Sequence, residues 1–519
     1  HGYANPAHEQ AMAAVLREVY PEASVTLSHE LSREYREYER TSTSVIDAYV
    51  KPITRTYLER LDGELQASGF KGHFLLTRSG GGAMTVASAR EQPVHLVLSG
   101  PAGGVIGAAH LSQLIRQENL ITLDMGGTSL DASLIAGGQP RVENEQLFET
   151  LPISIPTIDI HTIGAGGGSI AWVDDGGHLQ VGPQSAGAVP GPACYNKGGQ
   201  AATFTDAALA VGYLDPNNFL GGEIKLEAAL TQQAIADLAG QLGLSFDETA
   251  AGILRISIAK IAGAVRVISI EQGYHPRDFA ILAFGGGGAF VAARIARELG
   301  IPRVIVPPGP ANFSAFGMLM VDVVHDYAQT YVTGLESVDI ARLNEIYAGL
   351  LEHGQAALVE DGFDEAHRTF VPLAELRYQG QEHTVNLTMP GHHLSAGDVP
   401  NIIASFNAAH QQQYGHSMDD PVEIVTLRLR AVGLLPRPEM PKIEPGTGRA
   451  DSARKGTRSV YQYEQSRRVD YAIYDRGLLL GGDHIDGPAI IEEPSSTTVI
   501  HTGDVLTVGE YGELVIDTV

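Results

Sequence analysis

The sequence predicts an α/β protein that divides into about three units. Residues 279–308 (FAILAFGGGGAFVAARIARELGIPRVIVPP) read as a strand, a glycine turn, a helix and a strand. Residues 121–137 (ITLDMGGTSLDASLIAG) read as two apolar strands joined by a glycine hairpin. A chain of 519 residues is also too long for a single core. We expect units at 1–115, 116–330 and 331–519, the last an α+β domain with a β-rich tail.

The composition excludes several classes of partner. The chain has 61 acidic and 35 basic residues, a formal net charge of −26, and it lacks a basic run, so it should repel nucleic acid and anionic membranes. No stretch of about 18 apolar residues is present, so no helix is expected to span a membrane. The single cysteine, Cys194, excludes an intramolecular disulfide and suits a reducing cytosol, which predicts a cytoplasmic location.

The first 115 residues read mainly as helices. The chain opens with HGYANPAHEQ, which has neither an initiating Met nor a signal-peptide pattern, and this indicates an internal start. Amphipathic helices are expected over 7–20 and over 45–66, where Tyr49, Ile53 and Tyr57 belong to the apolar face. The segment PAGGVIGAAHL predicts a helix with so many small residues that another helix must approach it closely.

The hairpin at 121–137 carries the chemistry of a phosphate site. Adjacent Gly126 and Gly127 allow positive φ and close approach, so their amides and that of Thr128 could converge on a phosphate oxygen. Asp124 and Asp131 are hard oxygen ligands of the kind that Mg²⁺ prefers. The alternative is an ordinary β-hairpin with a Gly-Gly turn. The candidate ligands of this hairpin are Asp124, Gly126, Gly127, Thr128, Ser129 and Asp131.

A second candidate site follows along the chain. Asp159 and His161 are two apart on an expected strand and so share a face, where they could bind one metal or one substrate. The alternative is a hydrogen-bonded structural couple, but the adjoining glycines at 164–168 favour a site. The loop 181–199, dense in Gly and Pro, is long enough to suggest a functional role. Asp206 is expected mainly to cap a helix, with Thr205 or Asp206 itself at the N-cap.

The glycine turn within 279–308 consists of Gly285, Gly286, Gly287 and Gly288. Alone, this turn is a weak signal of a dinucleotide site, because the dinucleotide fingerprint requires an acidic residue after the next strand, and Pro307 and Pro308 stand there. The alternative to a dinucleotide site is a base or ribose that lies over the glycines. Residues 313–326 then predict another small-residue helix.

The C-terminal part has a different character. The alternation of apolar residues predicts strands, and the tail suggests a small barrel or sandwich. The expected helices are 337–361 and 397–414, and the expected strands lie in 370–380, 422–435, 487–508 and 512–519.

The order of these parts resembles the superfamily of actin, sugar kinases, acetate kinase and heat-shock chaperone ATPases. GPAGGVIGAA and FSAFGMLM look like its two connecting helices, LDMGGTSLDASLI like its second phosphate motif and FGGGGAFVAA like its adenosine motif. The resemblance implies an ATPase-like core, with the remainder of an N-terminal lobe at 1–115 and a second lobe at 116–330.

Within that superfamily the chain is similar, nearly end to end, to the hydantoinase A/5-oxoprolinase family. The matching segments are NPAHEQ, REYERTSTSVIDAYVKP, LSGPAGG, DIHTIGAGGGSIAWV, GPACY, TDA and GPAIIEEPSSTTV. This resemblance implies ATP-dependent opening of a cyclic amide such as a hydantoin, 5-oxoproline or another lactam, or ATP-dependent carboxylation of a ketone. It also implies ATP and Mg²⁺ as cofactors and a partner subunit of the hydantoinase B type. A non-catalytic, actin-like scaffold is the alternative from another class.

The resemblance assigns roles to the candidate residues. Asp124 would hold Mg²⁺ through water, the hairpin glycines with Thr128 would hold phosphate, and Gly285 to Gly288 would lie under the adenosine. Asp159 and His161 would face the substrate or a second divalent metal. Two departures qualify this transfer. Family members begin with a further segment that carries a DxGGTxxD motif, and this sequence does not include it, so that segment is a further candidate partner. In addition, Val291 stands where relatives usually have His.

Overall fold

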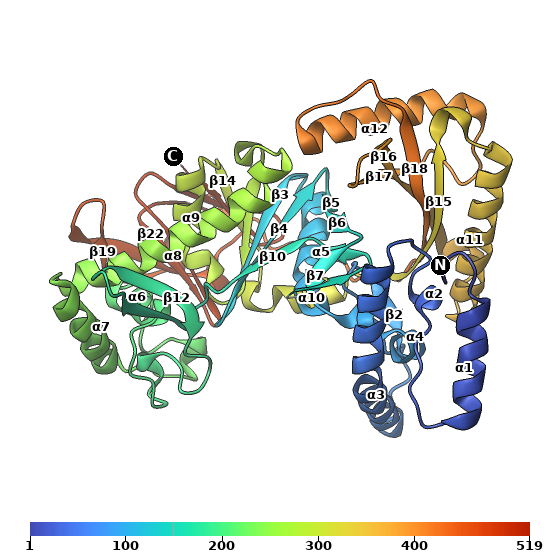
Figure 1. Ribbon diagram of the computed structural model, residues 1–519. Coiled ribbons are helices and arrows are strands. Elements are labelled where there is room, and N and C mark those ends of the chain that lie inside the picture. The colour runs from blue at the N-terminus through green and yellow to red at the C-terminus, as the bar shows by residue number, and fades with distance from the viewer. Residues whose placement is uncertain (149, 519) are drawn as a thin grey trace. The chain divides into compact units, whose positions relative to one another are not determined.

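A computed structural model describes residues 1–148 and 150–518 (Figure 1). Val519, the last residue of the expected C-terminal domain, lies outside the described residues. The mixed helices and sheets confirm the predicted α/β class. The chain forms two compact units, each assembled from three separate stretches. Unit 1 comprises His1–Ile106, Val142–Ile158 and Leu319–Arg437, and unit 2 comprises Gly107–Arg141, Asp159–Met318 and Pro438–Val519. The division at residues 115 and 330 stays a prediction.

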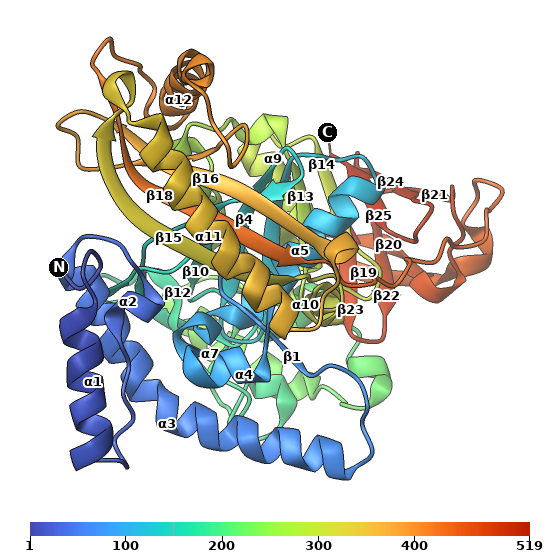
Figure 2. The ribbon, with the colours of Figure 1, turned by 90° about the vertical axis from the view of Figure 1, so that its right-hand side faces the viewer.

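Unit 1 is built around a six-stranded sheet with the order β1-β2-β15-β18-β16-β17. Helix α11 (Ile340–Glu360) packs across β15, β16 and β18, as Figure 2 shows. The strands are β1 (Leu75–Thr77), β2 (Ala83–Thr85), β15 (Val323–Gly334), β16 (Arg368–Tyr378), β17 (Val385–Thr388) and β18 (Val422–Gly433). The further helices are α1 (Ala7–Val19), α2 (Ser28–Leu31), α3 (Glu37–Ala67), α4 (Val86–Glu91) and α12 (Val399–Tyr414). Unit 1 also contains two small two-stranded sheets, β6 (Val142–Glu143) with β9 (Thr157–Ile158) and β7 (Gln146–Phe148) with β8 (Leu151–Ile153).

Unit 2 is built around a nine-stranded sheet with the order β10-β4-β3-β13-β14-β25-β24-β21, and β5 pairs with β4. β3 runs antiparallel to β4 and parallel to β13. The strands are β3 (Leu120–Met125), β4 (Leu130–Ala136), β5 (Gln139–Pro140), β10 (Ile160–Ile163), β13 (Ala280–Phe284), β14 (Arg303–Val306), β21 (His484–Asp486), β24 (Val505–Val508) and β25 (Leu514–Asp517). The helices are α6 (Phe204–Val211), α7 (Ala228–Leu242), α8 (Phe246–Ile268), α9 (Gly288–Leu299) and α10 (Phe313–Met318), and α5 (Ser99–Leu114) leads into this unit.

The β-rich tail differs from the small barrel or sandwich that the sequence suggests. Only β19 (Arg454–Gln462), β20 (Arg467–Asp475), β22 (Ala489–Glu493) and β23 (Ser496–Ile500) form a sheet of their own. The other tail strands extend the nine-stranded sheet, where β25 pairs antiparallel with β14. This pairing provides hydrogen-bond partners for the backbone groups of β14 on the edge that β13 does not cover. An unpaired strand edge would promote aggregation. A separate hairpin of β11 (Ser169–Val173) and β12 (Leu179–Ser185) also belongs to unit 2.

Two helices differ from the sequence predictions. The helix expected over 313–326 ends at Met318, and a strand begins at Val323, because the β-branched residues beyond Met320 favour extended backbone. Helix α3 is longer than the expected 45–66 and continues through Pro52. Its face with Tyr49 and Ile53 is exposed rather than packed.

The close approach predicted for the first small-residue helix is confirmed. A Cβ added at Gly107 of α5 would lie 3.0 Å from the Cα of Gly317 in α10. A side chain at Gly107 would crowd the backbone of α10, so glycine at this position allows the close approach. In the described part of the chain, no helix is both long and apolar enough to cross a membrane.

Candidate active site

The predicted hairpin forms as expected, with β3 and β4 joined at an exposed tip. The strand register places Asp124 directly opposite Asp131. The amide of Gly126 donates to the carbonyl oxygen of Ser129 over 3.0 Å and closes the turn. Gly126, Gly127 and Thr128 are exposed at the tip, and the Gly126 amide is already used by this bond within the turn.

A glycine loop at 164–168 packs on this tip. The amide of Gly167 donates to the Gly126 carbonyl oxygen over 3.0 Å, and that of Gly168 to the Gly127 carbonyl oxygen over 2.6 Å. A Cβ added at Gly166 would lie 2.6 Å from the carbonyl carbon of Thr128, so only glycine fits there. The glycines at 164–168 indicated a functional site in the sequence, but they did not indicate that this loop contacts and supports the hairpin.

The second glycine turn, Gly285–Gly288, also contacts the hairpin, at the end of β3. Gly287 donates its amide hydrogen to the Met125 carbonyl oxygen over 3.0 Å. Gly285 has a φ of +75°, and a Cβ added there would lie 2.5 Å from Oδ1 of Asp124. The structure therefore brings together the hairpin and Gly285–Gly288, two motifs that the residue patterns predict separately and that the family resemblance assigns to one ATP site. The binding roles of these residues stay predictions.

The two carboxylates of the hairpin are partly withdrawn from water. Burial raises the pKa of Asp124, the charge of Asp131 raises it further, and a hydrogen bond from the Ser314 hydroxyl over 3.0 Å opposes the rise. Burial also raises the pKa of Asp131, which accepts a hydrogen bond from Thr162 over 2.5 Å. Two facing acidic groups of this kind suit a divalent cation, because its charge would relieve both their repulsion and their desolvation.

Asp159 and His161 do not form a pair in the structure. Oδ2 of Asp159 accepts a hydrogen bond from the Gln272 side chain over 3.0 Å and lies 3.7 Å from Nε of Arg141. His161 lies in β10 opposite Ala132. Among residues 1–148 and 150–518, no group of three or more His, Cys, Asp or Glu side chains is placed to hold a metal. The Asp159 carboxylate therefore fits a structural role better than a second metal site, and its predicted function has no support from geometry.

A small, partly open pocket lies beside the second glycine turn. Gly286 and Phe290 form one side, and the loops 214–220 and 492–497 form the rest. Its lining residues are Leu214, Asp215, Asn218, Phe219, Leu220, Gly286, Phe290, Glu492, Glu493, Pro494, Ser495, Ser496 and Thr497. The Ser496 hydroxyl is buried and has no hydrogen-bond partner in the described part of the chain. Sequence reasoning missed this pocket, although the run of hydroxyl residues after Pro494 was a usable signal.

Asp206 organises the backbone that flanks the site. It is not the N-cap of α6 as expected, because Thr203 is the cap and Asp206 occupies the third helical position of a capping box. Its fully buried carboxylate accepts from the amides of Ala193, Cys194 and Thr203 and from the hydroxyls of Thr203 and Thr231. This network fixes the end of the long Gly-Pro loop. Burial also raises the pKa of the Cys194 thiol, which makes it unreactive.

Val291 is fully buried in α9, directly after the second glycine turn. The position therefore contributes packing in this chain, and any role that a histidine ring plays there in relatives is absent.

Comparison with known proteins gives a family match over most of the chain. A family model described as "Hydantoinase/oxoprolinase" matches residues 40–327, and one described as "Hydantoinase/oxoprolinase C-terminal domain" matches residues 335–514. The chain is 36% identical to caprolactamase subunit alpha of Pseudomonas jessenii over 504 residues, which cover 96% of this chain and 72% of that protein. It is 30% identical to the acetophenone carboxylase gamma subunit of Aromatoleum aromaticum over 537 residues, covering 100% and 73% of the two chains.

Solved structures agree with the sequence matches. The crystal structure of the ATP-dependent caprolactamase from Pseudomonas jessenii superposes with a TM-score of 0.91 at 34% identity, covering 99% of this chain and 75% of that one. Nucleotide-free acetone carboxylase superposes with a TM-score of 0.78 at 27% identity, covering 100% of this chain and 75% of that one.

Proposed function

Since this chain belongs to the hydantoinase/oxoprolinase family, we propose that it is a subunit of an ATP-dependent cyclic amidase that opens a lactam or related ring. The observation that carries the proposal is the convergence, within unit 2, of the Asp124–Asp131 pair, the exposed hairpin tip and the glycine turn at Gly285. The caprolactamase structure, which resembles this chain throughout, is described as ATP-dependent and supports the assignment.

The arrangement suits a nucleotide that extends from the hairpin to the pocket. The Gly127 amide and the Thr128 residue would bind the phosphates at the exposed tip, whereas the Gly126 amide donates to Ser129 and holds the turn in shape. The adenosine would lie against Gly286, because this exposed glycine has no side chain and allows a base or sugar to approach the backbone closely. A buried hydroxyl without a partner, Ser496, would then be available for hydrogen bonding to the base or sugar.

Mg²⁺ fits the acidic pair of the hairpin. Asp124 and Asp131 would hold it directly or through water, and the ion would neutralise negative charge on the phosphates. The Ser314 hydroxyl orients Asp124 by donating to its Oδ2. No step is assigned to a second metal, because the Asp159 carboxylate already contacts Gln272 and Arg141.

The proposed reaction overcomes the stability of the amide by phosphorylation. The amide oxygen attacks the γ-phosphorus, the bond to ADP breaks, and the ring nitrogen gives up its proton. Water then adds to the activated carbon, the ring C–N bond breaks as nitrogen takes a proton, and an acyl phosphate remains. A second water hydrolyses it to carboxylate and phosphate. Hairpin amides directed at the transferring group would stabilise its developing charge.

The test measures phosphate release by the assembled enzyme with ATP and a panel of lactams and hydantoins. We expect release that depends on the ring substrate and falls at least about 100-fold in Asp124→Asn, because a carboxylate that would hold Mg²⁺ at the transferring phosphate is lost. Asp175→Asn, which changes an exposed carboxylate of the same unit, should retain wild-type turnover. Phosphate release that ignores the lactam, or that survives Asp124→Asn, would exclude the proposal.

A ketone carboxylase is the second candidate, favoured by the likeness to acetone carboxylase and to the acetophenone carboxylase gamma subunit. The caprolactamase structure has the higher TM-score, which is why we place the amidase first. ATP turnover stimulated by bicarbonate plus a ketone, and not by a lactam, would reverse this order. Calorimetric titration with ATP and Mg²⁺ would identify a mere scaffold by the absence of binding.

The proposed enzyme also includes a second subunit of the hydantoinase B type. The relatives named above carry the word "subunit" in their names, which supports a multi-subunit assembly. The cytoplasmic location stays a prediction.

A further inference from the structure

Thr205 contacts the glycine loop at 164–168, the loop that supports the hairpin. It is buried in the first turn of α6. Its hydroxyl donates to the Gly167 carbonyl oxygen over 2.8 Å, and its amide donates to the same oxygen over 2.9 Å. One carbonyl oxygen thus accepts two hydrogen bonds from one residue, which uses both of its lone pairs. The direction of the Gly167 carbonyl is therefore fixed by Thr205.

The Gly167 carbonyl belongs to a peptide group whose other end contacts the hairpin. This peptide bond is trans, and in a planar trans peptide the N–H points away from the C=O. The N–H of this peptide group is that of Gly168, and it donates to the Gly127 carbonyl oxygen over 2.6 Å. A hydrogen bond accepted by a carbonyl makes the N–H of the same peptide group a better donor. Thr205 therefore polarises the group that donates this short hydrogen bond.

The same relation continues into the hairpin tip. The Gly127 carbonyl shares a peptide group with the Thr128 amide, so that amide points away from the loop. The Gly126 carbonyl accepts from the Gly167 amide over 3.0 Å and directs the Gly127 amide in the same way. Within the part of the chain that the structure describes, neither the Gly127 amide nor the Thr128 amide has an acceptor. Both amides are left for a ligand, and contacts with the loop set their direction.

We propose that Thr205 is a positioning residue for the phosphates of the nucleotide. The inference rests on the proposed function, in which the hairpin tip binds phosphate. Thr205 acts through two peptide groups in series, first the one that joins Gly167 to Gly168 and then the one that joins Gly127 to Thr128. The Thr128 amide is thereby a stronger donor with a fixed direction, and such a donor stabilises an oxygen that carries negative charge.

Three variants isolate the hydroxyl of Thr205. Thr205→Val keeps the shape and the backbone amide but removes the hydroxyl, and Thr205→Ser keeps the hydroxyl. Thr249→Val is the matched control, because Thr249 is fully buried in α8 of the same unit and its hydroxyl donates to the Ser245 carbonyl oxygen over 2.9 Å. Each valine variant loses one hydroxyl-to-carbonyl hydrogen bond, so the two should melt at similar temperatures.

The first measurement is calorimetric titration of the chain with ADP and Mg²⁺. Thr205→Val should bind ADP about 5-fold more weakly than wild type, the scale of one neutral hydrogen bond, whereas Thr205→Ser and Thr249→Val should keep the wild-type affinity. An unchanged binding stoichiometry in every variant would separate weaker binding from a loss of folded protein. Thr205→Val that binds ADP as tightly as wild type would overturn the inference, and so would an equal loss of affinity in Thr249→Val.

The second measurement observes the peptide groups by nuclear magnetic resonance of the ligand-free chain. Labelling glycine carbonyls with ¹³C and threonine amides with ¹⁵N selects the Gly–Thr pairs, whose amides are those of Thr128, Thr447 and Thr457. The Thr128 resonance should shift in Thr205→Val and return toward its wild-type position in Thr205→Ser, while the other two resonances stay in place. A Thr128 resonance that does not respond to the loss of the Thr205 hydroxyl would contradict the proposed polarisation.

The outcomes distinguish this inference from the proposed function. A chain that shows the expected ADP pattern but supports no lactam-dependent phosphate release would overturn the proposed reaction and leave the role of Thr205 intact. A wild-type chain that binds no ADP would overturn the nucleotide site and the role of Thr205 together.

Discussion

Asp124 and Asp131 lie directly opposite each other on adjacent antiparallel strands, and the charge of Asp131 raises the pKa of Asp124. Like charges in this position destabilise a sheet unless a cation joins them. The hairpin therefore carries unfavourable electrostatics in the absence of a ligand, and binding of a divalent cation would remove it.

Asp131→Asn should stabilise the ligand-free protein at neutral pH. Burial raises the pKa of Asp131 above its ordinary 3.8, so the stability that this group contributes is fully present below that value and is lost as the pH rises through the raised pKa. We expect the variant to melt above wild type at pH 7 and to match it near about pH 3. Calorimetric melting checks this, with Asp175→Asn unchanged at both pH values. A lower melting temperature at pH 7 would contradict the argument.

Gly285→Ala should destabilise the protein and disable nucleotide binding. Its φ of +75° disfavours any side chain, and the new methyl would meet Oδ1 of Asp124 at 2.5 Å. A cost of about 1–3 kcal/mol is expected from the backbone conformation and the clash together. Gly286→Ala is the matched control, because its nearest neighbour would be 4.0 Å away, and it should keep the wild-type melting temperature. Equal melting of both variants would refute the assigned backbone strain.

Asp206→Asn should cost about 3–5 kcal/mol of stability, because it breaks a buried network and sets an amide group against backbone donors. Thr231→Val, which removes a single 2.9 Å hydrogen bond to Asp206, should cost about 1 kcal/mol. Urea unfolding followed by the fluorescence of Trp172, which lies in the same unit, measures both. If the two variants unfolded alike, the carboxylate would not be the centre of the network.

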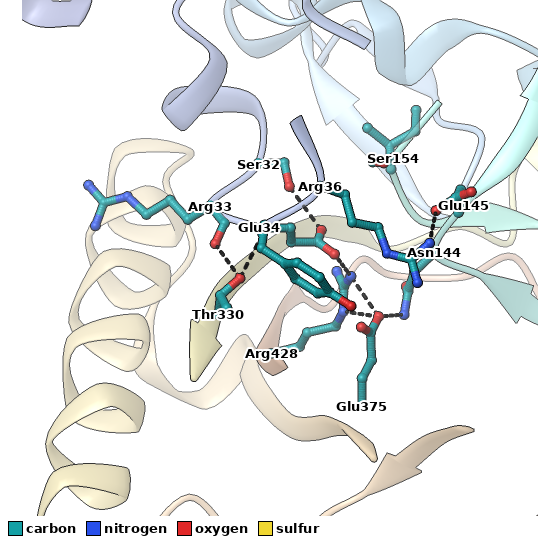
Figure 3. Close-up of polar contacts among 12 residues, drawn as sticks. Ser32, Arg33, Glu34, Arg36, Asn144, Glu145, Ser154, Thr330, Glu375 and Arg428 are labelled. Carbon is teal, nitrogen blue, oxygen red and sulfur yellow. Dashed lines mark hydrogen bonds and ion pairs between the residues drawn. The ribbon is translucent and has the colours of Figure 1, made fainter. Parts of the chain in front are cut away.

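Arg428→Met should destabilise unit 1 by about 3–5 kcal/mol at neutral pH, because it leaves two buried carboxylates unpaired. The Arg428 guanidinium lies 2.6 Å from Oε2 of Glu34 and 2.8 Å from Oε1 of Glu375 (Figure 3). Burial already raises the pKa of Glu34, followed in the same direction by the charge of Glu375, while Arg428 opposes the rise. The loss should therefore diminish at low pH and in the double variant with Glu375→Gln. Arg437→Met, which removes a more exposed pair with Asp322, should change stability by about 1 kcal/mol or less.

Local patterns allowed much of the fold to be predicted. The hairpin at 121–137 and the unit from β13 to β14 are contiguous, and their apolar periodicity and glycines specify them without reference to the rest of the chain. The same holds for α1, which the sequence predicts over 7–20 and which spans Ala7–Val19.

Features that depend on distant segments could not be predicted. The loop at 164–168 meets the hairpin through backbone groups, which leave no mark in residue type beyond glycine. The pocket combines residues 214–220 and 492–497, far apart in the sequence. The sequence predicts the apolar stripe of α3, but periodicity alone cannot tell whether such a stripe is buried or, as here, exposed.

The pairing of β25 with β14 has a consequence for how the protein is made. The hairpin at 121–137 and the glycine turn at 285–288 are synthesised long before residues 514–517, which form β25 and pair with β14 in the same sheet. Contacts so distant in sequence form slowly, and nascent sheets with an open edge attract chaperones and aggregate easily. A truncation that removes only the last strand should therefore compromise a nucleotide site whose own residues are all still present.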